Sequence, residues 1–335
     1  MPATIGDVAR VAGVGRGTVS RVLNDRPNVD PETRERVHRA IAELDYVPSA
    51  TARRLSLGRT NTIMIVGPFL TRPSTVARMA GIQQGLEAAG LDGITTSVER
   101  VDRRAAVIQE AARRERADGL ILINIAPNAA EADRIVAADI PCVLIDAHHR
   151  RLPRVVLDDV GGGHLAALHL IEFGHRHIGF VGDVPLAGFG FSSTRLRLRG
   201  VGRTLRDVGL ELPDDHIGLG EHSREGARQS TLRMLDAPRP PTAIIAASDT
   251  EAMGVLEAAR LRQLRVPEDL SVIGYDDIDV ADFIGLTTIR QPLFETGTRA
   301  VERLTARIAG RDTRPLREVL PVELVVRATT GPARR

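Results

Sequence analysis

The residues with the clearest chemical potential lie near the amino end of the chain, between positions 5 and 25. Here two segments with helical spacing of apolar residues are separated by a turn that contains Gly13. The second segment presents a polar face made of Arg16, Gly17, Thr18, Ser20 and Arg21. An arginine can donate two hydrogen bonds to O6 and N7 of guanine, so this face suits the reading of base edges in a major groove. The order helix, turn, helix predicts a DNA-binding helix-turn-helix, although the bare pattern also occurs in proteins without that function.

Other polar clusters resemble parts of enzyme or metal sites, but none completes one. They are the glycine run 161–163, the histidine pairs 148–149 and 175/177, and the aspartate pairs 158–159 and 276–277. The glycines lack the spacing of a dinucleotide-binding turn and the lysine of a P-loop, which favours tight packing between a strand and a helix. The histidines have no acidic or cysteine partner at a recognised metal spacing, and no nucleophile accompanies the aspartates. We therefore expect no enzyme, no cofactor and no metal site, and aspartates that cap helices or bind polar ligands.

Composition and charge fit this interpretation. The chain has 335 residues, of which 43% are hydrophobic, so it can bury the core of more than one domain. The formal net charge is only +2, but residues 1–60 contain ten Arg and seven Asp or Glu, which places the positive excess at the amino end. Cys142 is the single cysteine, lies in an apolar run and is expected to be an inert core residue. Because the sequence shows no signal-peptide pattern and no long apolar run, we expect a soluble, cytoplasmic protein.

Local signals divide residues 4–45 into three short helices that would position the polar face. Thr4 and Asp7 have the spacing of a capping box, which predicts that the first helix begins directly after Thr4. The second helix is predicted at about 16–23. Asp30 and Pro31 start the third helix, because the first is a favoured cap and the second suits the first helical turn.

From residue 62 onward, short apolar runs alternate with amphipathic helices. Strands are predicted at 62–67, 93–98, 119–125, 141–146, 154–159, 177–182, 242–248 and 270–276, and helices near 75–89, 102–115, 129–138, 161–173, 193–208, 223–235 and 249–261. This alternation predicts parallel sheets covered on both faces, and the number of units favours two α/β lobes. Ligands in such folds bind at the carboxyl ends of the strands, here in a cleft between the lobes. The final residues, 329–335, are expected to be loose.

Motifs along nearly the whole chain resemble the lac repressor / galactose repressor (LacI/GalR) family of transcriptional regulators. They include DVARVAGV, TVSRVLN, AIAELDYVPS, DGLILIN, PCVLID, EFGHRHIGFVGD, AIIAASDTEAMG and SVIGYDDID, in family order between residues 4 and about 327. The resemblance implies an α/β protein with an N-terminal all-α helix-turn-helix headpiece at 1–47 and a hinge helix and linker at 48–60. It also implies a two-lobed core at 61–330, similar to periplasmic binding proteins. The segment 49–57 would form a marginal helix alone and is expected to order on DNA.

The resemblance also implies which residues contact DNA. By their match to the family's motifs they are Thr4, Ile5, Gly15, Arg16, Gly17, Thr18, Ser20, Arg21, Asn24, Tyr46, Ser49, Ala52, Arg53 and Leu55. Arg16 and Gly17 occupy the positions that set operator choice, and Leu55 matches a leucine that wedges into the minor groove. Gly15 departs from the commoner serine, which puts one phosphate contact in doubt. Arg53 could instead belong, with Arg54, to a solvated linker, and Leu55 could be an ordinary buried contact.

In the core, the resemblance implies that seven residues bind an effector. They are Phe69, Arg72, Asp146, Arg197, His222, Asp249 and Asp276. We expect Arg197 and Asp276 to face each other across the cleft, each at the mouth of its lobe, in a cleft that is open and wet when empty. A structural ion pair between these two residues is the alternative.

The implied function is allosteric regulation of transcription, most often repression. The implied partners are a pseudo-palindromic double-stranded DNA operator, a second copy of the chain in a homodimer, and a small, sugar-like effector; no membrane is involved. Two other functions are the alternatives, and the first of them shares the two-lobed core. A solute-binding protein of the periplasmic type conflicts with the headpiece, and an α/β enzyme conflicts with the absence of a catalytic constellation.

Overall fold

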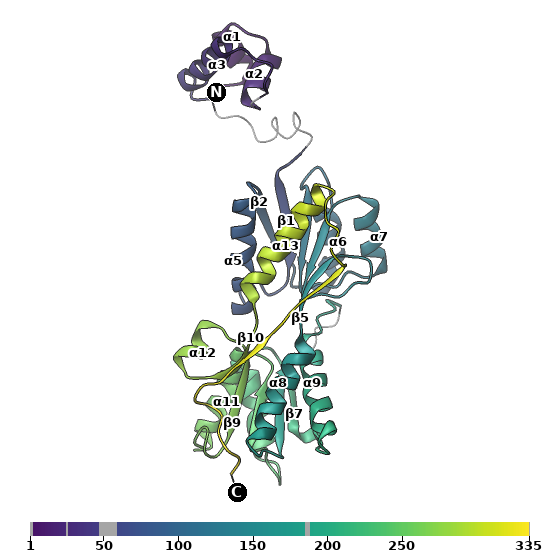
Figure 1. Ribbon diagram of the computed structural model, residues 1–335, viewed down its shortest axis with the longest axis vertical. Coiled ribbons are helices and arrows are strands. Elements are labelled where there is room, and N and C mark those ends of the chain that lie inside the picture. Colours follow the sequence, from purple (N-terminus) through teal and green to yellow (C-terminus); the bar gives the residue numbers. More distant parts are fainter. Residues whose placement is uncertain (1–2, 25, 47–58, 185–187, 335) are drawn as a thin grey trace. The chain divides into compact units, whose positions relative to one another are not determined.

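The computed structural model describes residues 3–24, 26–46, 59–184 and 188–334. The chain divides into two compact units, residues 1–61 and residues 62–335 (Figure 1). Among the described residues, no helix is both long and apolar enough to cross a membrane.

The first unit contains the three helices that the local signals predict: α1 (Ile5–Ala12), α2 (Arg16–Leu23) and α3 (Pro31–Glu43). Thr4 and Asp7 form the predicted capping box at the start of α1, because each accepts a hydrogen bond from the other's backbone N–H. Gly13 follows α1 with φ +66°, a conformation that glycine adopts at little cost. The Asp30 carboxylate caps α3 by accepting from Thr33 N at 2.8 Å.

Small apolar residues hold these three helices together. Their core consists of Val8, Ala9, Ala12, Val19, Val22, Val37, Ala40 and Tyr46, each at most 8% exposed. The spacing of Val19 and Val22 turns one face of α2 inward. The opposite, polar face of α2 therefore remains available to solvent.

The second unit contains two lobes, each a six-stranded sheet with helices on both faces. The first sheet has the order β11-β5-β4-β3-β1-β2 and is parallel throughout. Its strands are β1 (Thr62–Gly67), β2 (Asp92–Ser97), β3 (Gly119–Ile123), β4 (Cys142–Ile145), β5 (Arg154–Leu157) and β11 (Arg317–Leu320). One face is covered by α5 (Pro73–Ala88) and α13 (Leu293–Ile308), and the other by α6 (Val101–Ala111) and α7 (Ala129–Ala137).

The second sheet has the order β12-β10-β9-β8-β6-β7 and is parallel except for β12. Its strands are β6 (Ile178–Asp183), β7 (Ile217–Gly220), β8 (Ala243–Ala246), β9 (Ser271–Asp276), β10 (Thr287–Arg290) and β12 (Glu323–Val325). Its helices are α8 (Asp159–Glu172) and α9 (Ser193–Asp207) on one face, α10 (Arg224–Leu235) and α11 (Asp249–Leu261) on the other, and the short α12 (Asp279–Phe283). A 3-10 turn, Asp214–His216, precedes β7.

The chain passes between the lobes three times: from β5 to α8, from β10 to α13, and from β11 to β12 (Figure 1). The last two crossings return α13 and β11 to the first lobe. These elements, together with β7, β10, α12 and β12, were not among the predicted strands and helices.

The glycine run 161–163 allows close packing of α8, in part as predicted: Gly162 lies against Tyr275 of strand β9, whereas Gly163 lies against helix α9. A Cβ on Gly163 would lie 2.1 Å from the carbonyl oxygen of Arg197, and one on Gly162 would lie 1.9 Å from the hydroxyl of Tyr275. The Asp158 carboxylate caps α8 by accepting from Gly161 N at 2.9 Å. Cys142 is also buried as predicted, and burial raises the pKa of its thiol to about 12.

The prediction of a loose carboxyl end was wrong. Thr329 and Thr330 are buried, and the Thr330 hydroxyl lies 2.9 Å from Nε2 of His169. The carbonyl oxygen of Gly331 lies 3.0 Å from Nε2 of His175, and Ala333 N donates to Phe173 O at 2.8 Å. The polar residues of the tail thus satisfy buried histidines of the second lobe.

Candidate functional site

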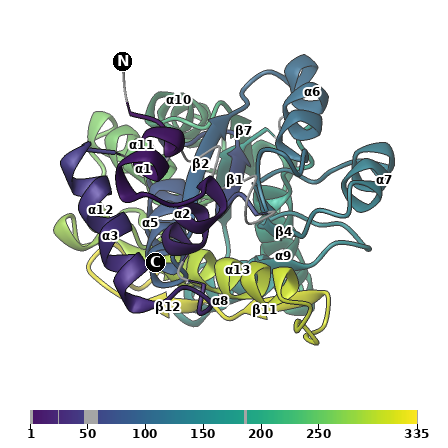
Figure 2. The ribbon, with the colours of Figure 1, turned by 90° about the horizontal axis from the view of Figure 1, so that it is seen from above.

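The polar face of α2 is presented as the helix-turn-helix pattern predicts. Arg16, Gly17 and Arg21 are exposed, and Thr18 and Ser20 are partly exposed, whereas Val19 and Val22 of the same helix are buried. The helix itself packs against α1 and α3 (Figure 2). Gly15 is the N-cap of α2 and provides no side-chain cap, so a phosphate could take the place of a capping side chain at the start of α2. The guanidinium of Arg16 lies beside Gly6 at the start of α1. A Cβ added to Gly6 would be only 3.1 Å from Nη2 of Arg16.

The other predicted DNA-contacting residues are placed more variably. Thr4 is exposed and Ile5 is half-buried. Asn24 donates from Nδ2 to the Ser20 carbonyl oxygen at 2.9 Å, and Tyr46 is 8% exposed in the headpiece core. Four predicted contacts lie outside the described residues: Ser49, Ala52, Arg53 and Leu55.

In the second unit, a cavity between the two lobes collects most of the predicted effector residues. Arg72, Asp146, Arg197, His222 and Asp276 all line it. The loop after β1 and the end of β4 contribute from the first lobe, and α9, the loop after β7 and the end of β9 contribute from the second. The carboxyl ends of parallel strands thus supply the site, as the fold predicts. The free volume is only about 30 Å³, room for about one water molecule, so the prediction of an open cleft was wrong.

Arg197 and Asp276 do not face each other across the cleft, so that prediction was wrong. Both belong to the second lobe, and Nη1 of Arg197 lies 3.9 Å from Oδ1 of Asp276. Nε of Arg197 donates to Asp159 Oδ1 at 2.9 Å, Nη1 donates to the carbonyl oxygen of Ala247 at 2.5 Å, and the guanidinium lies 3.7 Å from the centre of the Tyr275 ring. The alternative prediction, a structural ion pair between Arg197 and Asp276, therefore describes part of the arrangement, because Arg197 also pairs with Asp159. The residue spacing could not show it, because the two side chains are 79 positions apart and approach only when α9 and β9 fold into one lobe.

The charges around Arg197 are mutually dependent. Burial alone would lower the pKa of the Arg197 guanidinium, but Asp159, Tyr275 and Asp276 hold that pKa above its ordinary value. Burial raises the pKa of Asp276 to about 6, against the opposing effect of Arg197. Asp276 also accepts a hydrogen bond from the Gln291 amide and has φ +116°, an uncommon conformation that fixes its position at the end of β9.

From the first lobe, Arg78 and Asp146 form a second buried ion pair. Arg72 lies with its guanidinium 3.7 Å from the ring centre of Phe69, and its Nη1 is 3.8 Å from Oδ2 of Asp183 in the other lobe. The contact between Arg72 and Asp183 joins the two lobes at the cavity. Phe69 itself lies behind Arg72 and does not line the cavity.

Asp249 is placed one layer below the cavity. It is fully buried at the start of α11, where Oδ1 accepts from the Thr288 hydroxyl at 2.6 Å and Oδ2 accepts from Ile278 N at 2.9 Å. Burial, and then repulsion by Asp276, raise the pKa of Asp249 to about 8. In this conformation Asp249 supports the loop behind Asp276 and does not itself line the cavity.

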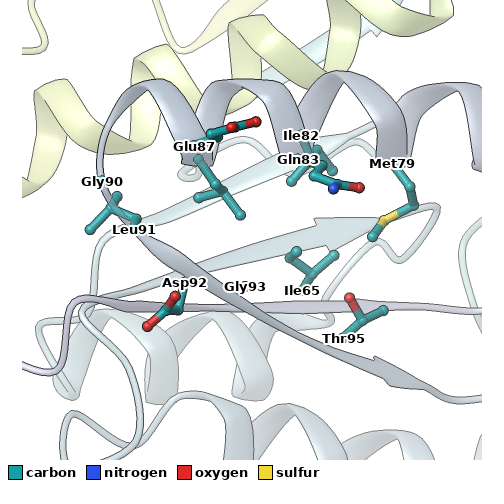
Figure 3. Close-up of a pocket in the computed structure, with 11 residues that line it drawn as sticks. Ile65, Met79, Ile82, Gln83, Glu87, Gly90, Leu91, Asp92, Gly93 and Thr95 are labelled. Carbon is teal, nitrogen blue, oxygen red and sulfur yellow. The ribbon is translucent and has the colours of Figure 1, made fainter. Parts of the chain in front are cut away.

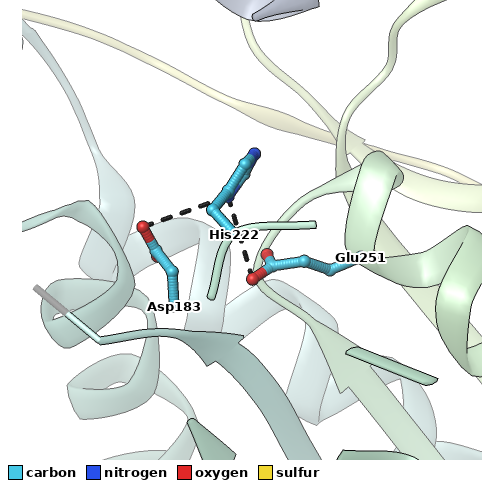
Figure 4. A group of neighbouring side chains, drawn as sticks. All are labelled: Asp183, His222 and Glu251. Atoms are coloured by element: carbon cyan, nitrogen blue, oxygen red, sulfur yellow. Dashed lines mark ion pairs between the residues drawn. The ribbon is translucent and has the colours of Figure 1, made fainter. Parts of the chain in front are cut away.

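Three residues of the second lobe form a polar cluster at one end of the cavity: Asp183, His222 and Glu251 (Figure 4). Nδ1 of His222 lies 3.9 Å from Oδ2 of Asp183 and 3.8 Å from Oε1 of Glu251. Burial, and then Arg72, lower the pKa of His222 to about 4, so the imidazole is neutral near pH 7. Burial and the neighbouring Asp183 raise the pKa of Glu251 to about 8. Sequence reasoning did not single out Asp183 or Glu251.

A larger groove lies elsewhere, between α5 and the edge strand β2 (Figure 3). It has a volume of about 600 Å³ and is lined by apolar residues such as Ile65, Met79 and Ile82, with Gln83 and Glu87 on its helix side. None of the predicted effector residues lines it. Because a polar ligand needs convergent polar groups, the inter-lobe cavity is the better candidate site despite its smaller volume.

Known proteins share both the sequence and the architecture of the chain. Residues 4–49 match the family described as bacterial regulatory proteins, lacI family, and residues 167–330 match a periplasmic binding protein-like domain. The transcriptional regulator DegA of Bacillus subtilis is 33% identical over 99% of both chains. The ribose operon repressor of Escherichia coli is 33% identical over 91% of this chain and 93% of its own.

Solved structures agree with these sequence matches. The lac repressor dimer bound to operator and the anti-inducer ONPF has a TM-score of 0.89 at 30% identity, covering 99% of this chain and 100% of that one. The complex of the regulator CelR with cellobiose has a TM-score of 0.72 at 30% identity, covering 98% and 99%. On this evidence, the chain belongs to the lacI family of bacterial regulatory proteins and is a DNA-binding transcriptional regulator with an effector-binding core, not an enzyme.

Proposed function

We propose that the effector of this regulator is a small molecule rich in hydroxyl groups, a sugar or sugar derivative, that binds in the inter-lobe cavity. The observation that carries this proposal is the convergence of guanidinium and carboxylate groups on one small volume. An arginine can only donate hydrogen bonds and a carboxylate can only accept them, whereas a sugar hydroxyl does both. Cellobiose in the CelR complex is a ligand of this chemical class.

The small volume of the cavity gives the effector a mechanical role. A sugar cannot enter about 30 Å³, so the lobes must part before it binds and settle around it afterwards. The contact between Arg72 and Asp183 at 3.8 Å joins the lobes directly over the cavity and would have to open. Effector binding therefore changes the equilibrium between lobe arrangements, which is the differential interaction that allostery requires.

At the other end of the chain, the proposed DNA contacts are made by α2, with Arg16 and Gly17 reading bases. Segment 48–60 is the proposed hinge and linker, with Leu55 as its minor-groove wedge. We propose that two copies act together on a pseudo-palindromic operator, as a repressor. The lac repressor is a dimer on its operator. The exposed apolar side chains of Phe283, at 90%, and Val76, at 53%, offer surface that a second copy could cover.

The test combines a ligand screen with a DNA assay. The full chain is heated with sugars, sugar phosphates and purines, and a ligand present at 100 times its Kd should raise stability by about 2.7 kcal/mol. That ligand should then change the mobility shift of the DNA beside the chain's own gene. A protein that binds a sugar but no such DNA would act as a solute-binding protein. A shift that no small molecule alters would refute the effector proposal.

A further inference from the structure

The cluster of Asp183, His222 and Glu251 brings together three side chains that could each supply one ligand to a metal ion. The three residues come from the end of β6, the loop after β7 and the first turn of α11, so residues far apart in sequence converge on one point (Figure 4). Their potential ligand atoms all lie within 4.8 Å of one another. Around a tetrahedral Zn²⁺ with bonds of about 2.0–2.1 Å, ligand atoms are about 3.3 Å apart. The 3.8 and 3.9 Å separations from Nδ1 of His222 therefore need to close by about half an ångström.

A second, independent observation points to a ligand at this cluster. Glu251 is 1% exposed, and its Oε1 has no hydrogen-bond partner among the described residues. Its other oxygen, Oε2, accepts from the Ser248 hydroxyl at 2.8 Å, which fixes the carboxylate with Oε1 directed at His222. Leaving a carboxylate oxygen buried without a partner is costly, so the position favours a cation or a donor.

The donor set selects the type of cation. One imidazole nitrogen and two carboxylate oxygens suit Zn²⁺ and similar divalent transition metals, whereas Mg²⁺ and Ca²⁺ prefer oxygen ligands alone. The Thr194 hydroxyl donates to Oδ1 of Asp183 and thereby orients Oδ2 toward the cluster, as outer partners of metal ligands do. Arg72, 3.8 Å from Asp183, is a competing cation, but it can neutralise only one of the two carboxylates.

We propose that Asp183, His222 and Glu251 bind one divalent transition-metal ion, of the Zn²⁺ type, at the end of the effector cavity. Asp183 and His222 line that cavity, so the open coordination position faces the space where a water molecule or a ligand hydroxyl would sit. The site lies in the proposed effector cavity, but metal binding by these three side chains does not depend on the identity of the effector.

The experiment measures metal binding to the full chain after treatment with a chelator. Titration with Zn²⁺ in a calorimeter should give one ion per chain, and Co²⁺ should develop the visible absorption bands of a low-symmetry site with a nitrogen ligand. Glu251→Gln should lower Zn²⁺ affinity at least about 10-fold, the lower end of what outer-sphere changes alone cost. The matched control is Glu257→Gln on the same helix, where Glu257 pairs with Arg224 and Arg228.

A second variant keeps the result interpretable if Glu251→Gln does not fold. His222→Gln changes a side chain that is 16% exposed and should lose the Co²⁺ bands while retaining the thermal transition of the wild type. Zn²⁺ binding that is absent from the wild type, or equal in the wild type and His222→Gln, would overturn the proposal. The sugar screen described above is read in metal-free buffer, so its failure and that of the metal titration are separate results.

Discussion

Replacing Arg197 by alanine should destabilise the core strongly, because its guanidinium is the shared partner of several buried groups. The side chain is 9% exposed and donates to Asp159 at 2.9 Å and to the Ala247 carbonyl oxygen at 2.5 Å. Without it, Asp159 and Asp276 remain as buried carboxylates with no compensating cation at that position. Removing one partner of a buried ion pair costs about 3–5 kcal/mol.

This free-energy loss has a measurable thermal consequence. For a core of this size, 1 kcal/mol lowers Tm by about 2 °C, so Arg197→Ala should unfold about 6–10 °C below the wild type. The matched control is Arg203→Ala on the same helix, α9, where the side chain is 74% exposed and pairs with Asp207 only at 3.9 Å. That variant should change stability by less than about 0.5 kcal/mol. Thermal unfolding followed by circular dichroism compares the two.

A double variant tests the mechanism of the loss. Combining Arg197→Leu with Asp159→Asn removes the buried cation and one of its carboxylates together, and apolar contact with the Tyr275 ring is kept. If uncompensated charge causes the loss, the double variant should be more stable than Arg197→Ala by at least 1 kcal/mol. A Tm of Arg197→Ala equal to that of Arg203→Ala would refute the reasoning outright.

Three further predictions concern DNA binding and pH. Arg16→Ala should cost about 1–3 kcal/mol on the operator and relax base preference at one position per half-site, whereas Arg36→Ala on α3 should not change base preference; binding to single-base operator variants decides this. Leu55→Ala should weaken binding to operator more than to random DNA in competition assays, and equal losses would contradict the wedge. The pKa of Asp249 is raised to about 8 in the folded protein. Between about pH 4 and pH 8 the folded state therefore keeps a proton on Asp249 that the unfolded state has released. The contribution of this group to the free energy of unfolding consequently falls as the pH rises through that range. Asp249→Asn cannot titrate, and Thr288 can reverse its hydroxyl to accept from the new amide; urea unfolding of this variant at pH 6 and pH 8 should show a weaker pH dependence than the wild type.

The sequence was most informative where structure depends on near neighbours. The capping box of Thr4 and Asp7 and the cap by Asp30 involve residues three positions apart, so their spacing is enough to predict them. The buried strands up to residue 276 were recognisable because both faces of a parallel sheet are covered, which makes each strand a short apolar run. The family resemblance then placed five of seven proposed effector residues around one cavity.

What could not be predicted depends on contacts between distant segments. Nothing local in Leu293–Ile308 shows that this helix packs on the first lobe, although its apolar spacing is a signal for a helix. The burial of Thr330 depends on His169, more than 150 positions away. Glu251 follows Ser248 at the spacing of a capping box, so its sequence context indicates a helix start and conceals its position beside His222.

The threefold passage of the chain between the lobes constrains how the protein is made. The first lobe is incomplete until α13 and β11 have been synthesised, at residues 293–308 and 317–320, so it cannot finish folding on the ribosome before the second lobe has emerged. Until then, one face of the first sheet is only partly covered. This face includes Ile63, Ile121 and Val143, which α13 later covers, and the exposed apolar residues can associate with other chains. A fragment that begins at α8 would likewise carry α13 without its sheet. Neither lobe can therefore be isolated by a single truncation, and nascent chains stalled before residue 293 should be prone to aggregate.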